Sequence, residues 1–222
     1  MRFADRAEAG RALARALLPL RPYAPVVLGL PRGGVPVAAE VAAHLEADLD
    51  VVVVRKVGAP GNAELAVGAV GEQGVTVRVD AVLADLGIAW EDVADTVRRE
   101  RAAVRARSAA LRGDTEPVDL AHRMAVLVDD GVATGATMAA AVRVVRGRGA
   151  TGVVVATPVA PPGAGERLGT DAFICLSSPR RFTSVGQWYA DFTQVGDAEV
   201  RALLEAWATG STAPAAGRAA RP

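Results

Sequence analysis

Two adjacent aspartates, Asp129 and Asp130, follow an aliphatic run directly in the stretch VLVDDGVATGATM at 126–138. Side-by-side carboxylates repel each other, so placing them at the end of a buried strand is costly unless a ligand uses them. A strand–loop–helix junction in a parallel sheet directs backbone N–H groups toward an anion at the helix N-terminus. Carboxylate oxygens accept hydrogen bonds from hydroxyls. A diol next to a phosphate, as in a ribose 5-phosphate, is therefore the ligand chemistry that this stretch predicts.

The turn after the aspartates suits a phosphate, and other motifs fit it less well. Gly131 and Gly135 permit a tight backbone, while Thr134 and Thr137 add hydroxyl donors. A Walker A loop needs a lysine where Ala136 stands, and no G-x-G-x-x-G opens a helix. The two histidines of the chain lie in other segments and offer no metal-ligand spacing. A simpler alternative is that the two aspartates only cap the following helix.

Short apolar runs that alternate with amphipathic segments indicate an α/β fold whose parallel sheet is flanked by helices. The expected strands are 25–30, 48–56, 123–128, 152–159 and 171–176. The expected helices are 4–18, 35–45, 90–112, 137–148 and 197–208. The basic stripe of 90–112 is interpreted as a solvated helix face, although contact with phosphates is an alternative.

Two segments depart from this alternation. Residues 57–80 are rich in turn-forming residues and predict a flexible excursion with a hairpin around Gln73 and Gly74. Residues 180–192 concentrate aromatic side chains, and we expect 180–208 to form a C-terminal hood. One domain over 1–208 and a disordered tail over 209–222 complete the expected organisation.

Composition restricts the class of protein. The 222 residues contain 25 Lys and Arg and 25 Asp and Glu, so no net charge attracts nucleic acid or an anionic membrane. No apolar run approaches the roughly 20 residues that cross a bilayer, and the charged start lacks a signal-peptide core. We expect a soluble cytoplasmic protein that binds neither nucleic acid nor membrane. Cys175, the single cysteine, is expected to be a buried structural thiol.

The aliphatic strand, the acidic pair and GVATGAT resemble the phosphoribosyl diphosphate signature of the type I phosphoribosyltransferases. LGLPRGGVPVA, VRKVGAPGNAELAVGAV and FTSVGQWYADFTQV are similar to a little-characterised bacterial branch of this family. The resemblance extends from about residue 5 to 207. It implies the family fold and Mg²⁺-dependent transfer of a 5-phosphoribosyl group from phosphoribosyl diphosphate to a small-molecule acceptor, with release of pyrophosphate. It leaves a homodimer open.

The resemblance also implies roles for individual residues. Asp129 and Asp130 would hold the ribose hydroxyls and, through these or through water, Mg²⁺. The phosphate-binding turn would be Gly131, Ala133, Thr134, Gly135, Ala136 and Thr137. The pyrophosphate loop would be Arg32, Gly33 and Gly34, with a cis peptide bond between Pro31 and Arg32. Arg55 and Lys56 would neutralise the leaving diphosphate, although one of them could instead extend its charge from a strand end to solvent.

The acceptor is less well specified. Enzymes of the family that act on 6-oxopurines carry an aspartate where this chain has Ala133, so hypoxanthine and guanine are not favoured. Glu64 is the best candidate for a general base, and an exposed loop residue is the alternative. Trp188, Tyr189 and Phe192 are candidates to stack on the acceptor, with at least one expected to anchor the C-terminal segment instead. A non-catalytic sensor of phosphoribosyl diphosphate or of a nucleotide is the alternative function.

Overall fold

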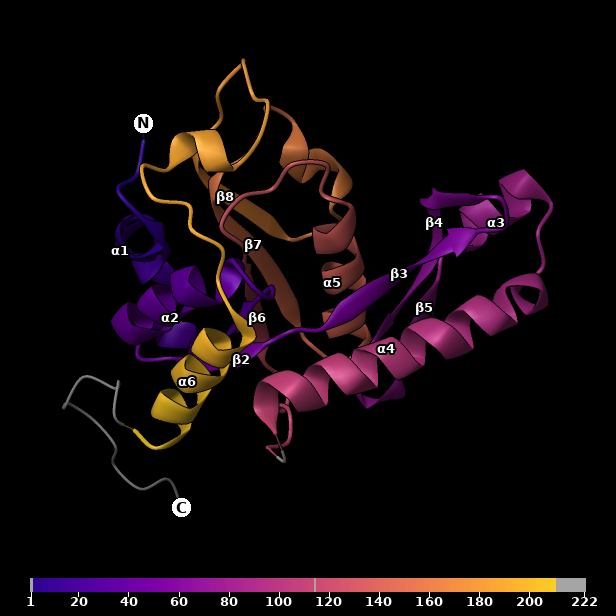
Figure 1. Cartoon of the computed structure of the whole chain (residues 1–222), viewed down its shortest axis with the longest axis horizontal. Helices are drawn as coiled ribbons and strands as arrows, with labels where there is room; N and C mark the ends of the chain where they lie inside the picture. Colours follow the sequence, from indigo (N-terminus) through magenta and orange to yellow (C-terminus); the bar gives the residue numbers. More distant parts are fainter. Residues whose placement is uncertain (1, 114, 211–222) are drawn as a thin grey trace.

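The computed structural model describes residues 2–113 and 115–210, and its centre is a five-stranded sheet (Figure 1). The strand order is β2-β1-β6-β7-β8, and every neighbouring pair is parallel. The strands are β1 (Val26–Gly29), β2 (Asp48–Val51), β6 (Met124–Val128), β7 (Gly152–Val159) and β8 (Ala172–Ser177). The expected α/β class, with a parallel sheet flanked by helices, is confirmed.

Alternation of side chains along the strands creates two apolar faces, each covered by helices. Val27 and Val126 pack against α1 (Arg6–Leu17) and α2 (Gly34–Leu45) on one face. Leu28 and Leu127 belong to the opposite face, which packs against α5 (Ala136–Gly147). Asp5 caps α1 as its side chain accepts a hydrogen bond of 2.8 Å from the Glu8 amide.

The excursion forms a second sheet with the order β3-β4-β5, in which neighbouring strands are antiparallel. Its strands are β3 (Val54–Ala59), β4 (Asn62–Gly71) and β5 (Thr76–Arg78). The hairpin around Gln73 and Gly74 is present between β4 and β5. The single strand expected at 48–56 is wrong, because β2 ends at Val51 and β3 starts in the other sheet. The break is stabilised at Val53, whose amide donates to Glu72 of the second sheet's hairpin over 3.3 Å.

A long helix connects the second sheet with the core, and the C-terminal helix packs beside it. After the short α3 (Asp80–Leu86), α4 (Ala94–Arg112) runs from the second sheet back to the core (Figure 1). The last helix, α6 (Asp197–Ala208), packs against α4 and α2. The tail expected to be disordered lies, from residue 211 onward, outside the described residues.

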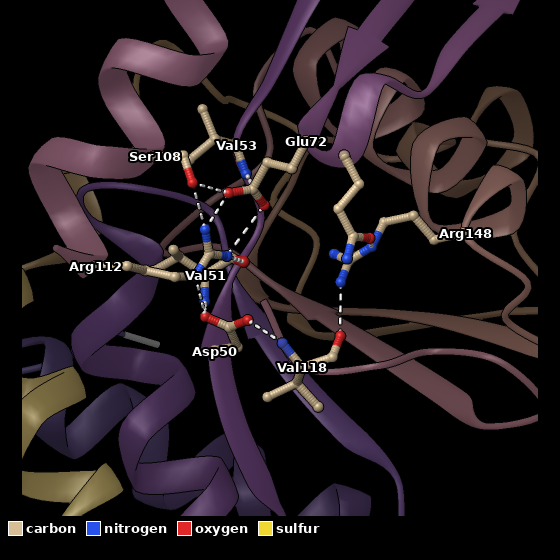
Figure 2. A network of polar contacts seen from close by, with 9 residues as sticks. Asp50, Val51, Val53, Glu72, Ser108, Arg112, Val118 and Arg148 are labelled. Carbon is tan, nitrogen blue, oxygen red and sulfur yellow. Dashed lines mark hydrogen bonds and ion pairs between the residues drawn. The ribbon is translucent and has the colours of Figure 1, made fainter. Parts of the chain in front are cut away.

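A buried polar network joins the core to the second sheet and α4 (Figure 2). The Arg112 guanidinium of α4 donates to Asp50 Oδ1 over 2.7 Å and to Glu72 Oε2 over 3.0 Å. Ser108 Oγ accepts from Arg112 over 2.7 Å and donates to Glu72. The Val118 amide donates to Asp50 Oδ2 over 3.0 Å. One guanidinium thus bridges two buried carboxylates that come from different parts of the fold.

Candidate functional site

The candidate site lies at the carboxyl ends of the core strands. Because β1 and β6 are parallel neighbours, the loops that follow them lie side by side at one edge of the sheet. A cavity of about 460 Å³ opens there. It is lined by Leu30, Pro31, Val52, Val53, Val54, Arg55, Lys56, Glu64, Arg107, Thr134, Ala136 and Thr137. Six of the proposed site residues therefore share one cavity with Arg107, which the sequence did not single out.

The acidic pair packs directly against the PRGG loop. A Cβ atom on Gly33 would lie 2.0 Å from Asp130 Oδ2, and one on Gly34 would lie 2.8 Å from Asp129 Cα. Glycine is required at both positions because the carboxylates and the loop backbone approach so closely. The peptide bond between Pro31 and Arg32 is cis, as expected from the resemblance. The two predicted ligand-binding loops thus form one continuous surface.

Asp130 is fixed by residues from both ends of the described chain. Arg6 Nε donates to Asp130 Oδ2 over 2.8 Å, and the two side chains are 11% and 12% exposed. Arg6 also donates to the Thr193 carbonyl and lies 4.0 Å from the centroid of the Phe192 ring. The Tyr189 hydroxyl donates to the Asp130 carbonyl over 2.6 Å. Sequence reasoning missed Arg6, since its partner is 124 positions away and no local signal marks it.

The two aspartates differ in their electrostatics. Burial, followed by the charge of Asp130, raises the pKa of Asp129 well above its ordinary value. Burial also raises the pKa of Asp130, but the hydrogen bond and the charge of Arg6 oppose that effect. Asp129 Oδ1 accepts a hydrogen bond of 2.9 Å from the Asp130 amide. A ligand that brings hydroxyl donors or a cation would offset the cost of ionising this pair.

The turn before α5 has the form of an anion site. Gly135 adopts a left-handed backbone with φ of 76°, which turns the chain into the helix that starts at Ala136. The first N–H groups of a helix have no intrahelical acceptor, and here they lie beside the cavity lined by Thr134 and Thr137. Ala133 is exposed in the same turn, whereas Gly131 is buried against Val185 of the C-terminal segment.

Cationic side chains line the side of the cavity that faces the second sheet. Lys56 Nζ lies 2.8 Å from Glu64 Oε2, across the β3–β4 hairpin. Arg55 is 57% exposed and lies 3.9 Å from Glu100. Arg107 reaches the cavity from α4, so at least this member of the basic stripe is not simply a solvated charge. Arg32 of the PRGG loop lies 3.7 Å from Asp197, which also binds Arg107.

The aromatic segment covers the acidic pair from the C-terminal side. Tyr189 is 2% exposed, and its ring centroid lies 5.7 Å from that of Phe3 and 5.1 Å from that of Phe192. Trp188 is half-buried and Phe192 is 36% exposed. Tyr189 thus has the environment of an anchor, while the other two rings retain accessible surface.

The acidic pair suits one kind of metal. Within 2–113 and 115–210, no group of three or more His, Cys, Asp or Glu side chains could hold an ion. Mg²⁺ usually keeps several waters and binds one or two carboxylates together with substrate phosphates. Asp129 and Asp130 supply the two carboxylates that such a site uses. None of the helices in the described segments has the length and apolar character that crossing a bilayer requires.

Comparison with known proteins assigns the family. A family model described as "Phosphoribosyl transferase domain" matches residues 11–191. The chain belongs to the phosphoribosyltransferase family. Proteins from two strains of Mycobacterium tuberculosis, each named "Putative phosphoribosyl transferase", are 46% identical to this chain over 205 residues. The match covers 91% of the chain but 46% of each relative, so the chain spans about half the length of these relatives.

A solved structure agrees closely with the fold. The crystal structure of TT1426 from Thermus thermophilus is 50% identical in sequence and superposes with a TM-score of 0.85. The superposition covers 93% of this chain and 99% of that one. The phosphoribosyltransferase fold described here therefore extends over nearly the whole of TT1426.

Proposed function

We propose that the protein transfers a 5-phosphoribosyl group from phosphoribosyl diphosphate to a nucleophilic small-molecule acceptor and releases pyrophosphate. The observation that carries the proposal is the contact of Asp129 and Asp130 with Gly33 and Gly34. This contact puts acceptors for sugar hydroxyls against a loop suited to a diphosphate. The helix N-terminus at Thr134–Thr137 opens into the adjacent cavity and suits the 5-phosphate.

Each group then has a defined task. Asp129 and Asp130 accept hydrogen bonds from the ribose hydroxyls, while Arg32 and the backbone at Gly33 and Gly34 bind the diphosphate. The bond between the anomeric carbon and the diphosphate oxygen breaks, and its electron pair leaves with pyrophosphate. Arg55 and Lys56 stabilise that developing charge. Asp129 and Asp130 would hold Mg²⁺ through the ribose hydroxyls or water, and the ion would neutralise further charge on the diphosphate.

Glu64 is the proposed general base, which takes the proton that the acceptor loses when it bonds to the anomeric carbon. Its carboxylate lines the cavity and is held by Lys56 at 2.8 Å, although 90% of its side chain is exposed. General-base catalysis typically contributes about 10²–10⁴-fold. Glu64→Gln should therefore lower kcat by about 10²-fold or more and leave the affinity for phosphoribosyl diphosphate within about twofold. An unchanged kcat with the natural acceptor would mean that Glu64 is an exposed loop residue and not the general base.

Ligand binding is tested by thermal stability. Phosphoribosyl diphosphate with Mg²⁺ at about 100 times its Kd should add about 2.7 kcal/mol, or roughly 5–10 °C in Tm. Asp129→Asn with Asp130→Asn should abolish this shift. Asp85→Asn, at an exposed position on α3, serves as the control and should keep it. A double variant that retains the full shift would contradict the assignment of the acidic pair.

Turnover is tested by pyrophosphate release across nucleobases, aromatic acids and amines. Release that depends on one acceptor class supports transfer and identifies the acceptor. Binding with no release from any member of the panel would instead support a non-catalytic sensor of the same ligand.

A further inference from the structure

Asp197, in the first turn of α6, lies between two arginines that come from different parts of the site. Arg107 Nη1 and Nη2 donate to its two carboxylate oxygens over 2.5 and 2.8 Å. Arg32 Nη1 lies 3.7 Å from Asp197 Oδ1. One carboxylate thus joins the PRGG loop, α4 and α6. The hydrogen bond from Arg107, followed by the charges of the arginines, lowers the pKa of Asp197.

Stability alone explains this arrangement poorly. The side chains of Arg32, Arg107 and Asp197 are 37%, 30% and 40% exposed. Ion pairs this exposed contribute little to stability, so this one opens at little cost. Arg107 also lines the cavity together with Arg55 and Lys56, whereas Asp197 does not.

The geometry of the pair is that of anion recognition. The planar arginine fork binds a carboxylate and a phosphoryl group in the same two-pronged way. Asp197 therefore occupies donors that an incoming phosphoryl group would use. Arg32 already belongs to the proposed diphosphate loop. The carboxylate that it shares with Arg107 holds this second guanidinium, from α4, next to the loop.

We infer that Arg107, together with Arg32, binds the diphosphate and that Asp197 is an internal counter-ion which the diphosphate displaces. In the empty site Asp197 holds the two guanidinium groups in place. When ligand enters, the donors transfer from the carboxylate to the phosphoryl oxygens. The return of Asp197 then favours release of pyrophosphate. The identity of the ligand rests on the proposed function, but pyrophosphate binding can be measured without turnover.

The test is the affinity for inorganic pyrophosphate with Mg²⁺, measured by titration calorimetry. Asp197→Asn removes the competing charge and should tighten binding by about three- to tenfold, up to about 1.4 kcal/mol. Glu199→Gln is the matched control, since it removes one negative charge from an exposed position in the same helical turn. It should change the affinity by less than about twofold, because long-range effects of exposed charges are screened.

A double-mutant cycle separates direct competition between Asp197 and pyrophosphate for Arg107 from a general change in the electrostatic field. Arg107→Gln should weaken pyrophosphate binding by about tenfold, and Arg107→Lys should recover part of the loss. In the Arg107→Gln background, Asp197→Asn should tighten binding by less than about twofold, because only the longer contact with Arg32 remains in competition. The urea concentration at the midpoint of unfolding should be nearly the same for each variant as for the wild type.

Three results would overturn the inference: no tightening in Asp197→Asn, equal tightening in Glu199→Gln, or tightening that is undiminished without Arg107. Its failure is distinct from failure of the proposed function. If Asp129→Asn with Asp130→Asn abolishes ligand stabilisation but the cycle shows no coupling, only the role of Asp197 is wrong. If the cycle shows coupling but no acceptor supports pyrophosphate release, transfer is wrong and the counter-ion role stands.

Discussion

Arg6 Nε donates to Asp130 Oδ2 over 2.8 Å, so the first helix of the chain fixes one carboxylate at the centre of the site. The Tyr189 hydroxyl holds the backbone carbonyl of the same residue. Asp129 instead lies against Gly34 and accepts the Asp130 amide. The adjacent aspartates are therefore not equivalent. Asp130 is oriented and partly neutralised by protein groups, and Asp129 depends more on the ligand for compensation.

Arg6→Met tests the first part of this statement. The substitution keeps most of the side-chain volume but leaves the carboxylate of Asp130 without its cation. Breaking a largely buried pair in this way costs about 3 kcal/mol of unfolding free energy. Arg11→Met is the control on the same helix, because Arg11 pairs with Glu40 at the surface. It should cost less than about 1 kcal/mol in urea unfolding. Equal losses in the two variants would show that the Arg6 pair is not specially coupled to the fold.

The raised pKa of Asp129 predicts a specific dependence of stability on pH. An unfolded aspartate titrates near about pH 4, and the native Asp129 only at higher pH. Between these values the native state binds more protons, so this group's contribution to stability falls as pH rises. The Asp129→Asn variant lacks this pH-dependent contribution to stability. Its unfolding free energy relative to wild type should rise with pH above about 4, by about 1.4 kcal/mol per unit of the pKa difference.

The comparison between the two proteins removes the titrations of groups outside the acidic pair. Hydrogen bonds from Arg146 and Arg107 lower the pKa values of Asp171 and Asp197, respectively. Below about pH 4 the contribution of these two residues to stability therefore rises with pH, which is opposite to the effect of Asp129. Both proteins contain these residues, so their effects cancel in the difference. Chemical unfolding of the two proteins from about pH 4 to about pH 7 measures the slope. Parallel curves over that range would mean that Asp129 is ionised at its ordinary pKa.

Local sequence patterns were sufficient for most of the fold. Apolar runs and amphipathic segments predicted the core strands and major helices because those patterns repeat within a few residues. The break between Val51 and Val54 was missed, since the run VVVV carries no local interruption. It is imposed by a distant partner, Glu72, which binds the Val53 amide.

The residues of the site also differ in whether local sequence patterns could predict them. The PRGG and DDGVATGAT loops could be assigned to one site from the family resemblance, and they meet because neighbouring parallel strands end at the same edge of the sheet. Arg6 and Arg107 could not, as their partners are 124 and 90 positions away. Long-range ion pairs leave no periodic signal in a single sequence. The basic stripe on 90–112 was the only hint of Arg107, and it fits a solvated helix equally well.

The buried network predicts the largest loss of stability. Arg112→Met would leave Asp50 and Glu72 without their shared cation, where the three side chains are at most 6% exposed. A loss of about 3–5 kcal/mol is expected in urea unfolding. Arg98→Met, which breaks an exposed pair with Asp95, should change stability by less than about 1 kcal/mol.

A compensated variant keeps this prediction testable if Arg112→Met fails to fold. Adding Asp50→Asn and Glu72→Gln removes both uncompensated charges and should restore much of the lost stability. If the triple variant is no more stable than Arg112→Met, packing of the long side chain matters more than its charge.

The excursion from Val57 to Val79 should act as a lid over the cavity. Its β3–β4 hairpin carries Lys56 and Glu64 to the cavity wall, so a ligand that binds there contacts the hairpin directly. Phosphoribosyl diphosphate with Mg²⁺ should slow amide hydrogen exchange in 57–79. Exchange in the middle of β7 serves as the reference and should not change. Slow exchange in 57–79 without ligand, and no change on adding it, would eliminate the lid.

The aromatic segment should divide into an anchor and an acceptor contact. Tyr189 is buried and donates to Asp130, so Tyr189→Phe should lower the unfolding free energy by about 1 kcal/mol without acceptor-selective kinetics.

Trp188 and Phe192 retain accessible ring surface. Trp188→Ala is the cleaner test of stacking, because Phe192 also packs on Arg6 and its removal would disturb Asp130. With the acceptor identified by the release panel, Trp188→Ala should raise the acceptor KM several-fold, as base–aromatic stacking contributes about 1–3 kcal/mol. The affinity for phosphoribosyl diphosphate should stay unchanged. If Trp188→Ala and Phe192→Ala only lower Tm, the segment is packing alone, and the acceptor pocket should be sought around Glu64.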